Sequence, residues 1–350
     1  MSKIRVMVVE DSAVVRALLQ HIIGGDARLE VMAAAASAEE ALSMLKRMSP
    51  DVIVMDIRLP GMDGLEATRR IMSQKPIPIV VVAGVVESKE RSSTTMEALR
   101  AGALSVLEKP VGTTHADYET LAERFCTQLA IMSQVKLVRQ TTRRNSRLLP
   151  AHDEPRRGGA YSMLGIVCST GGPGALVKLL GALGPDFPLP ILLVQHMTAS
   201  FLPGFASWLE SVCPFSVAMV SDGQVPAVGV VHMAPAEQHL RLDAGSLRLD
   251  LAAPVCGQRP SGTVLFQSMA SSLGGHALGI LLTGMGEDGA AGLGEIRQAG
   301  GYTIAEDEST AVVYGMPAVA VRMGAVCESL PLPAIAPRVL ELVSARPEMN

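Results

Sequence analysis

The stretch GIVCSTGGPGA, residues 165–175, decides the fold of the second half of the chain. The apolar run 163–167 is long enough for a buried strand, and apolar residues recur at helical spacing from 176 to 180. A strand that turns sharply into a helix places the turn at the carboxyl edge of a sheet, beside unpaired helix N–H groups and their positive field. The hydroxyl pair Ser169-Thr170 and the glycines around it therefore suit a nucleophilic serine with nearby oxyanion donors.

Other interpretations of this turn are open from its residues alone. Many glycine-rich turns between a strand and a helix are only tight connections. The stretch lacks the Gly-Lys-Ser/Thr of a P-loop and the Gly-x-Gly-x-x-Gly of a dinucleotide site. The Gly-x-Ser-x-Gly elbow of many hydrolases is absent too, because Val167 stands two residues before Ser169.

Two more strands of this half end in residues of catalytic type. The apolar run 189–195 leads to His196, and the run 277–282 leads to the segment TGMGEDG, residues 283–289, which contains Asp288. The carboxyl ends of parallel strands meet at one edge, so Ser169, His196 and Asp288 are expected to be neighbours. They supply a nucleophile, a base and an acid that orients the base. Cys168 is the rival nucleophile, but the pleat of a strand would turn its side chain into packing.

The remaining strands of this half are expected to be short. The ranges 228–234, 240–242 and 247–251 are predicted as strands, antiparallel at an edge of the sheet, and 263–273 as a helix.

Residues 1–125 alternate strands and helices and predict another parallel sheet. Its strands end in Glu10-Asp11, in Asp56 and, for the fifth, in Glu108 followed by Lys109. Three carboxylates at one edge repel each other unless a hard cation relieves them, and Mg²⁺ suits such a cluster. Glu10, Asp11 and Asp56 are therefore predicted metal ligands.

Length and composition agree with two domains of doubly wound α/β type. At 350 residues, with 48% hydrophobic residues, the chain can bury two large cores. We expect a first domain over 1–125, a helical extension and basic linker over 126–160, and a second domain over 161–345. A helix is predicted over 113–140 and ends within the linker segment. The scattered cysteines and the lack of a signal peptide or membrane span predict a cytoplasmic protein without membrane insertion. Aromatic residues make up only 3%, which argues against a nucleic-acid partner.

The first domain resembles the receiver domain of response regulators, a flavodoxin-like fold. The resemblance rests on Glu10-Asp11, Asp56, the segment LPGMDG at 59–64 and Lys109-Pro110. It implies that Asp56 is phosphorylated, that Glu10 and Asp11 help to hold Mg²⁺, and that Lys109 contacts the phosphoryl group. The chain departs from the family at Ala83, where a Ser or Thr is usual, and at Val106, where an aromatic residue is usual. Both departures predict a weakened conformational response to phosphorylation.

The second domain resembles the effector domain of the chemotaxis protein-glutamate methylesterases. The matching segments are CSTGG at 168–172, QHM at 195–197, Ala234-Pro235 with His239, RPS at 259–261, TGMGEDG at 283–289 and YGMP at 314–317. The resemblance assigns Ser169 as nucleophile, His196 as base and Asp288 as orienter. It also implies an oxyanion contribution from the backbone N–H of Met285, with Thr170 and Gly171 at the site rim. Where the family continues Val-Asp after RPS, this chain has Gly262-Thr263, which predicts a changed rim.

The resemblance implies a serine esterase that needs no cofactor for its esterase reaction. It would hydrolyse γ-glutamyl methyl esters on chemoreceptors, deamidate receptor glutamines, and respond to a histidine kinase that phosphorylates the receiver. A response regulator whose second domain only binds a partner is the alternative. A DNA-binding regulator is disfavoured, because the sequence has no basic reading helix.

Overall fold

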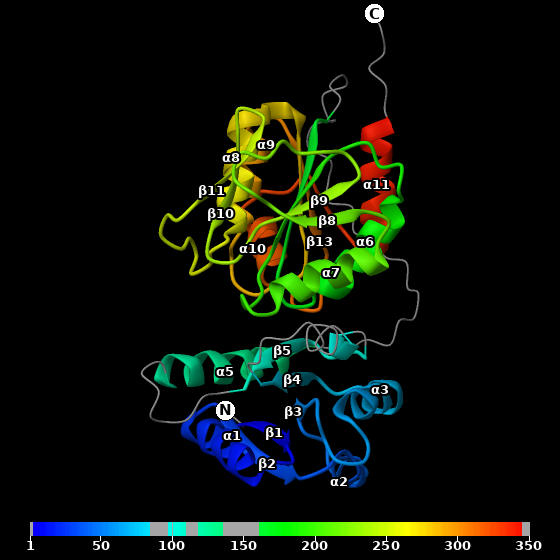
Figure 1. The fold of residues 1–350 in the computed structure, drawn as a ribbon, viewed down its shortest axis with the longest axis vertical. Coiled ribbons are helices and arrows are strands. Elements are labelled where there is room, and N and C mark those ends of the chain that lie inside the picture. The colour runs from blue at the N-terminus through cyan, green and yellow to red at the C-terminus, as the bar shows by residue number, and fades with distance from the viewer. Residues whose placement is uncertain (1–2, 85–96, 100, 110–117, 136–160, 345–350) are drawn as a thin grey trace, which may run out of the picture. The chain divides into compact units, whose positions relative to one another are not determined.

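The computed structural model describes residues 3–84, 97–99, 101–109, 118–135 and 161–344 (Figure 1). The chain divides into two compact units, Met1–Thr141 and Thr142–Asn350. Most of the predicted linker 126–160 lies outside the described residues, so the predicted domain limits stay a prediction. No helix in the described ranges is both long and apolar enough to cross a membrane.

The first unit is a five-stranded parallel sheet in the order β2-β1-β3-β4-β5, the flavodoxin-like order that the sequence predicted. The interior strands β1, β3 and β4 are mostly apolar and largely buried. Side chains cap the helices: Ser12 accepts from Val15 N at 3.4 Å, and Asp63 accepts from Glu66 N at 2.7 Å. The elements are β1 (Ile4–Val9), α1 (Ala13–Gly25), β2 (Leu29–Ala35), α2 (Ala38–Leu45), β3 (Val52–Asp56), α3 (Gly64–Gln74), β4 (Ile79–Ala83), β5 (Ser105–Glu108) and α5 (Tyr118–Met132).

Helix α5 ends earlier than the predicted range 113–140. Its last hydrogen-bonded turn tightens, with Gln134 N donating to Ile131 O at 3.0 Å and Val135 N to Met132 O at 3.1 Å. The hydroxyl of Ser133 also donates to Ala130 O at 2.7 Å, so the chain leaves the helix at Met132. Residues 113–117 and 136–140 of the prediction lie outside the described residues.

The second unit is a seven-stranded sheet in the order β14-β13-β12-β6-β7-β9-β8, parallel throughout, which confirms the predicted doubly wound class. Its elements are β6 (Met163–Cys168), α6 (Gly172–Leu183), β7 (Ile191–Gln195), α7 (Leu202–Val212), β8 (Ser216–Met219), β9 (Val230–Met233), β10 (His239–Asp243), β11 (Ser246–Asp250), α8 (Gly262–Leu273), a short 3₁₀ turn (Gly274–His276), β12 (Ala277–Leu281), α9 (Ala290–Gln298), β13 (Tyr302–Glu306), α10 (Met316–Arg322), β14 (Glu328–Leu330) and α11 (Leu332–Ser344).

One strand prediction was wrong in its direction. Strand β9, predicted to be antiparallel at an edge, runs parallel between β7 and β8 inside the main sheet. Its residues are mostly buried, as an interior parallel strand requires. Among the strands that the structure describes, only β10 and β11 pair antiparallel, and they form a separate two-stranded sheet. The edge strands β8 and β14 were not predicted.

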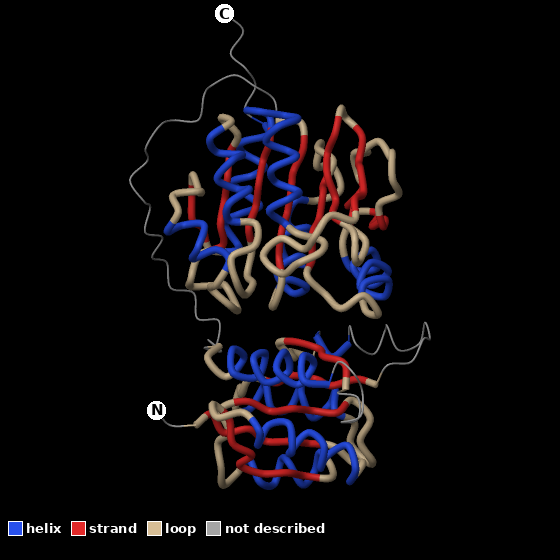
Figure 2. Tube along the Cα trace, turned by 90° about the vertical axis from the view of Figure 1, so that its left-hand side faces the viewer, coloured by secondary structure: helices blue, strands red, loops and turns tan. Residues whose placement is uncertain are grey.

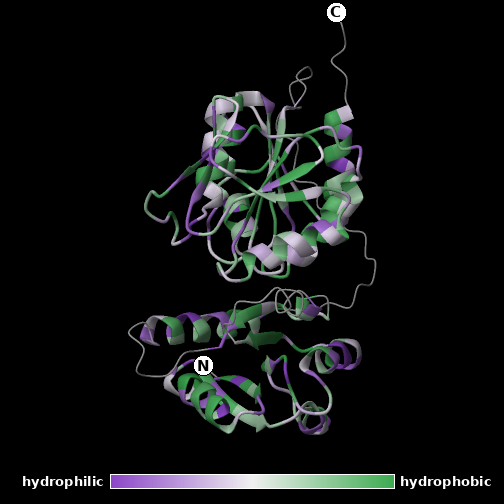
Figure 3. Cartoon of the chain, in the orientation of Figure 1, coloured by the Kyte–Doolittle hydropathy of each residue, from purple (hydrophilic) through white to green (hydrophobic). Residues whose placement is uncertain are grey.

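Helices cover both faces of the seven-stranded sheet. Helix α6 packs against α7 and α11, and α8 packs against α9, which also contacts α10 (Figures 1 and 2). The central strands of both sheets are mostly hydrophobic (Figure 3). After β6 the chain moves to β7 on one side, and it later returns to place β12 on the other side. The topological switch point, where open α/β sheets bind ligands, therefore lies between β6 and β12.

Candidate active site

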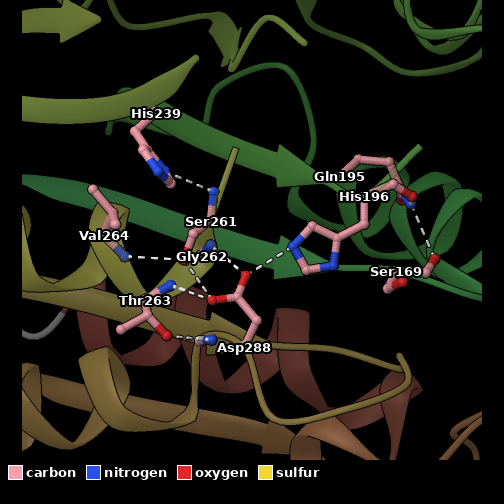
Figure 4. Close-up of polar contacts among 10 residues, drawn as sticks. Ser169, Gln195, His196, His239, Ser261, Gly262, Thr263, Val264 and Asp288 are labelled. Carbon is pink, nitrogen blue, oxygen red and sulfur yellow. Dashed lines mark hydrogen bonds and ion pairs between the residues drawn. The ribbon is translucent and has the colours of Figure 1, made fainter. Parts of the chain in front are cut away.

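The three predicted catalytic residues lie at the carboxyl ends of three adjacent strands. Ser169 directly follows β6, His196 directly follows β7, and Asp288 lies in the loop between β12 and α9. Backbone hydrogen bonds tie these strand ends together, with His196 N donating to Cys168 O at 3.0 Å and Ser169 N to Thr283 O at 3.0 Å. The structure thus brings the three residues to the switch point of the sheet (Figure 4).

The imidazole of His196 is oriented by Asp288. Its Nε2 lies 2.8 Å from Asp288 Oδ2, and both side chains are nearly excluded from solvent. With Nε2 as donor to the carboxylate, Nδ1 is left as the basic nitrogen. Ser169 lies on the side of the ring away from Asp288 (Figure 4). Among the described residues no hydrogen bond joins Ser169 Oγ to the imidazole, a looseness common in sites without substrate.

Asp288 is held by the N-terminus of α8. Its Oδ1 accepts from Ser261 Oγ at 2.6 Å and from Thr263 N at 3.0 Å, and its Oδ2 accepts from Gly262 N at 2.6 Å. Burial alone would raise the pKa of Asp288, but the hydrogen bonds from His196, Ser261 and Thr263 lower it to about 2. The carboxylate therefore stays ionised and fixed beside His196.

Gly262 and Thr263 lie beneath the site, which corrects the prediction that they change its rim. Both are buried, and a Cβ on Gly262 would lie 2.3 Å from Val167 Cγ1. The hydroxyl of Thr263 accepts from Gly289 N at 2.8 Å and so fixes the residue after Asp288. The two residues support Asp288 through their backbone N–H groups. These groups lie in the first turn of α8, where N–H groups have no partner within the helix, so they can donate whatever side chains the residues carry.

Ser261 helps to hold Asp288, a role that was not predicted from the sequence. Its hydroxyl donates to Asp288 and accepts from Val264 N at 3.4 Å as the N-cap of α8. Its own N–H donates to His239 Nδ1 at 3.2 Å, and His239 Nε2 contacts Ala253 O at 3.1 Å. A serine just before the apolar run 264–266 is an N-cap signal, which could have located the helix but not its carboxylate.

Cys168 is unsuited to be the nucleophile. It is fully buried, its thiol donates to Gln195 Oε1 at 3.1 Å, and burial raises the pKa of that thiol well above its ordinary value. The amide of Gln195 in turn donates to Ser169 O at 3.0 Å and to His196 O at 2.9 Å. Gln195, which the sequence analysis did not assign, joins the two strand ends.

The turn after Ser169 depends on close backbone packing. Gly171 has φ +81°, and a Cβ there would lie 2.5 Å from Val312 Cβ. The Thr170 carbonyl accepts from Thr283 Oγ1 at 2.8 Å. Met285 lies two residues beyond Thr283, in the loop between β12 and α9, and is 38% exposed. The oxyanion and rim roles of Thr170, Gly171 and Met285 stay predictions.

In the first unit the predicted acidic residues form one cluster. Single ligand atoms of Glu10, Asp11 and Asp56 lie within 4.8 Å of one another among the described residues. Lys109 Nζ lies 2.8 Å from Glu10 Oε2 and 2.9 Å from Asp56 Oδ2. Burial lowers the pKa of Lys109, but its contacts with the two carboxylates raise it overall. The pKa of Glu10 is raised overall, mainly by burial and also by the charge of Asp56, although Lys109 lowers it.

The cluster fits the Mg²⁺ that a receiver domain binds. Its donors are hard carboxylate oxygens, and they outnumber the single lysine charge that offsets them. Strand β4 ends at Ala83, whose carbonyl accepts from Lys109 N at 2.8 Å, so the departure from the usual hydroxyl lies next to the cluster. Val106 is half-buried on β5, at the core of the unit.

Comparisons with known proteins match both units of the chain. The family model "CheB methylesterase" matches residues 164–339. The chain belongs to the CheB methylesterase family. A second model, "Response regulator receiver domain", matches residues 6–117. The chain is therefore a response regulator that carries a hydrolase domain.

Relatives match over nearly their whole length. The chain is 58% identical to protein-glutamate methylesterase/protein-glutamine glutaminase 2 of Paramagnetospirillum magneticum, with 97% of each chain covered. It is 42% identical to protein-glutamate methylesterase/protein-glutamine glutaminase 4 of Myxococcus xanthus, with 96% of each covered. The crystal structure of the Thermotoga maritima CheB methylesterase catalytic domain matches 53% of this chain and 100% of its own, with 34% identity and a TM-score of 0.51.

Proposed function

We propose that this protein hydrolyses γ-glutamyl methyl esters on chemoreceptors, releases methanol, and deamidates receptor glutamines by the same route. The observation that carries the proposal is the His196–Asp288 contact of 2.8 Å, anchored on the N-terminus of α8 and set beside Ser169 on the neighbouring strand. The names of the relatives, protein-glutamate methylesterase/protein-glutamine glutaminase, support the same substrates.

Acylation begins when Ser169 Oγ attacks the ester carbonyl carbon. Nδ1 of His196 accepts the serine proton, and the ionised Asp288 stabilises the imidazolium that forms. The negative charge that develops on the carbonyl oxygen is placed at the backbone N–H of Met285. The imidazolium then gives its proton to the departing methoxide, which leaves as methanol, and an acyl-serine remains.

Deacylation repeats these steps with water. His196 takes a proton from the water, the hydroxide attacks the acyl carbon, and Ser169 leaves with the proton that the imidazolium returns. The product is a free glutamate. A glutamine substrate follows the same course with ammonia as the leaving group, and its amide carbonyl is harder to attack. No step calls for a cofactor.

The receiver unit is proposed to control the esterase through phosphorylation of Asp56 by a chemotaxis histidine kinase. Glu10, Asp11 and Asp56 would hold Mg²⁺, which neutralises phosphoryl charge when bound. Lys109, already in contact with Asp56, is placed to pair with a phosphoryl oxygen. We propose that the protein is cytoplasmic and that the unphosphorylated receiver restrains the esterase.

Release of labelled methanol from receptor membranes tests the proposal. Wild type should release it, and Ser169→Ala and His196→Ala should each lose several orders of magnitude, about 10³-fold or more, because the residues act as a unit. Cys168→Ala is the matched control and should remain active. An active Ser169→Ala with an inactive Cys168→Ala would reverse the assignment of the nucleophile. Wild type that released no methanol would favour a regulator that only binds a partner.

A further inference from the structure

Glu306 is a buried carboxyl group that the proposed mechanism does not use. It is the last residue of β13 and is 1% exposed. Its Oε2 accepts from Thr283 N at 2.9 Å, whereas its Oε1 is buried without a hydrogen bond among the described residues. Within those residues no lysine, arginine or histidine forms an ion pair with it. A lone buried carboxylate is costly, so a buried acid without a cation tends to be neutral.

Thr283, the residue that Glu306 holds, connects the parts of the esterase site. Its carbonyl accepts from Ser169 N at 3.0 Å, and its hydroxyl donates to Thr170 O at 2.8 Å. The same hydroxyl accepts from Val313 N at 2.9 Å. Met285, the proposed oxyanion donor, follows two residues later. A shift of Thr283 would therefore move the nucleophile turn and the Met285 loop together.

The groups that face Glu306 do not supply a balancing charge. Burial is the largest influence and raises the pKa of Glu306, and Asp307 raises it further. The N–H of Thr283, the side chain of Thr310 and the more distant charge of Lys178 lower it by less. The charge of Glu306 also raises the pKa of the Cys168 thiol, at the end of β6.

We propose that Glu306 is a positioning residue of the esterase site, which holds Thr283 from behind as a neutral carboxylic acid. This inference rests on the proposed esterase function for its catalytic readout. The neutral acid fixes Thr283 without placing a negative charge behind the oxyanion. Ionisation at higher pH would add that charge and oppose the oxyanion as it forms.

Two substitutions separate position from charge. Glu306→Leu removes the acceptor, and we expect kcat to fall about tenfold or more with little change in KM, because Thr283 N loses its partner. Glu306→Gln keeps an acceptor and cannot ionise. We expect it to restore kcat and to remain level at alkaline pH, where the wild-type rate falls about three- to tenfold. Glu308→Gln, an exposed neighbour with the same change of charge, is the matched control and should follow the wild-type profile.

The pH dependence of the free energy of unfolding reports on the charge of Glu306 without any measurement of enzyme activity. Because the pKa of Glu306 is raised above its ordinary 4.5, the contribution of this group to stability is full below that pH and is lost as pH rises through its folded-state pKa. Glu306→Gln should therefore gain stability relative to wild type as pH rises above about 4.5 in urea unfolding.

The outcomes are distinguishable. A Glu306→Leu variant that folds and keeps wild-type kcat would overturn the positioning role. If Glu306→Gln follows wild type in both pH profiles, the neutral acid is wrong. If wild type releases no methanol, the esterase proposal fails, and the unfolding series still decides the charge of Glu306. A Glu306→Leu variant that does not fold leaves the decision to the two Glu306→Gln profiles.

Discussion

Replacing Asp288 by asparagine tests the geometry of the esterase site most directly. Oδ2 of Asp288 accepts from His196 Nε2 and Gly262 N, and Oδ1 accepts from Ser261 Oγ and Thr263 N. The substitution turns one of these oxygens into an NH₂ group. Whichever way the amide is turned, that group faces a backbone N–H of the helix N-terminus, which cannot become an acceptor.

The cost follows from these contacts. One buried N–H without a partner costs about 1–3 kcal/mol, and loss of the negative charge at the helix N-terminus costs about 0.5–1 kcal/mol. We therefore expect the free energy of unfolding to fall by about 1.5–4 kcal/mol. If the NH₂ group faces His196, the ring proton moves to Nδ1 and the base is blocked, which lowers kcat on the order of 10⁴-fold in other Ser–His–Asp triads.

Methanol release and urea unfolding measure the two effects. Glu287→Gln is the matched control, since it removes one negative charge from the adjacent, exposed residue and should change neither quantity. Asp288→Asn should lose activity while KM changes little. A variant that kept a tenth or more of wild-type kcat at full stability would refute the role of Asp288 as the group that orients His196.

Three further outcomes are expected. Ser261→Ala should lower kcat about tenfold and cost about 1 kcal/mol of stability, because one hydroxyl is both donor to the carboxylate and helix N-cap, while Ser271→Ala on the exposed side of α8 should do neither. A fragment of residues 160–350 should be more active than the unphosphorylated full chain, and equal rates would refute restraint by the receiver. Phosphorylation should stimulate the wild type only weakly, since Ala83 cannot give the phosphoryl group a hydrogen bond of about 1.5–3 kcal/mol, and Ala83→Thr should raise the stimulation. Strong stimulation that Ala83→Thr leaves unchanged would point to another route.

The candidate site could be located from the sequence because the end of each apolar run marks the carboxyl end of a parallel strand. An apolar run that stops at Ser169, at His196 or shortly before Asp288 fixes each residue at one edge of the sheet. The direction of β9 could not be predicted in this way. Its partner β8 is only four residues long and partly exposed, and only ten residues, 220–229, join the two strands. Parallel neighbours usually need a longer crossover, so the pattern favoured an antiparallel edge.

The residues that hold the catalytic groups from below, Ser261 and Glu306, could not be predicted from the sequence for a different reason. Ser261 and Asp288 are 27 residues apart and meet only because α8 begins beside the loop after β12. Glu306 looks like an ordinary polar residue after the apolar strand 302–305. In the fold it is buried and interacts with Asp307 and Thr310 of the loop 307–315, and Val312 of the same loop would collide with a Cβ on Gly171. Contacts of this kind depend on three-dimensional packing that no periodicity encodes.

The difference in exposure between Cys168 and Cys256 decides how chemical labelling of this enzyme must be interpreted. Cys168 is buried next to Ser169 and its thiol donates to Gln195 Oε1, so an alkylating reagent cannot reach it in the folded protein. Cys256 is exposed, and Asp288 is near enough to add to the burial that raises the pKa of its thiol. Of these two thiols, only Cys256 is therefore open to a thiol reagent. A serine-directed phosphonate would report on the nucleophile itself.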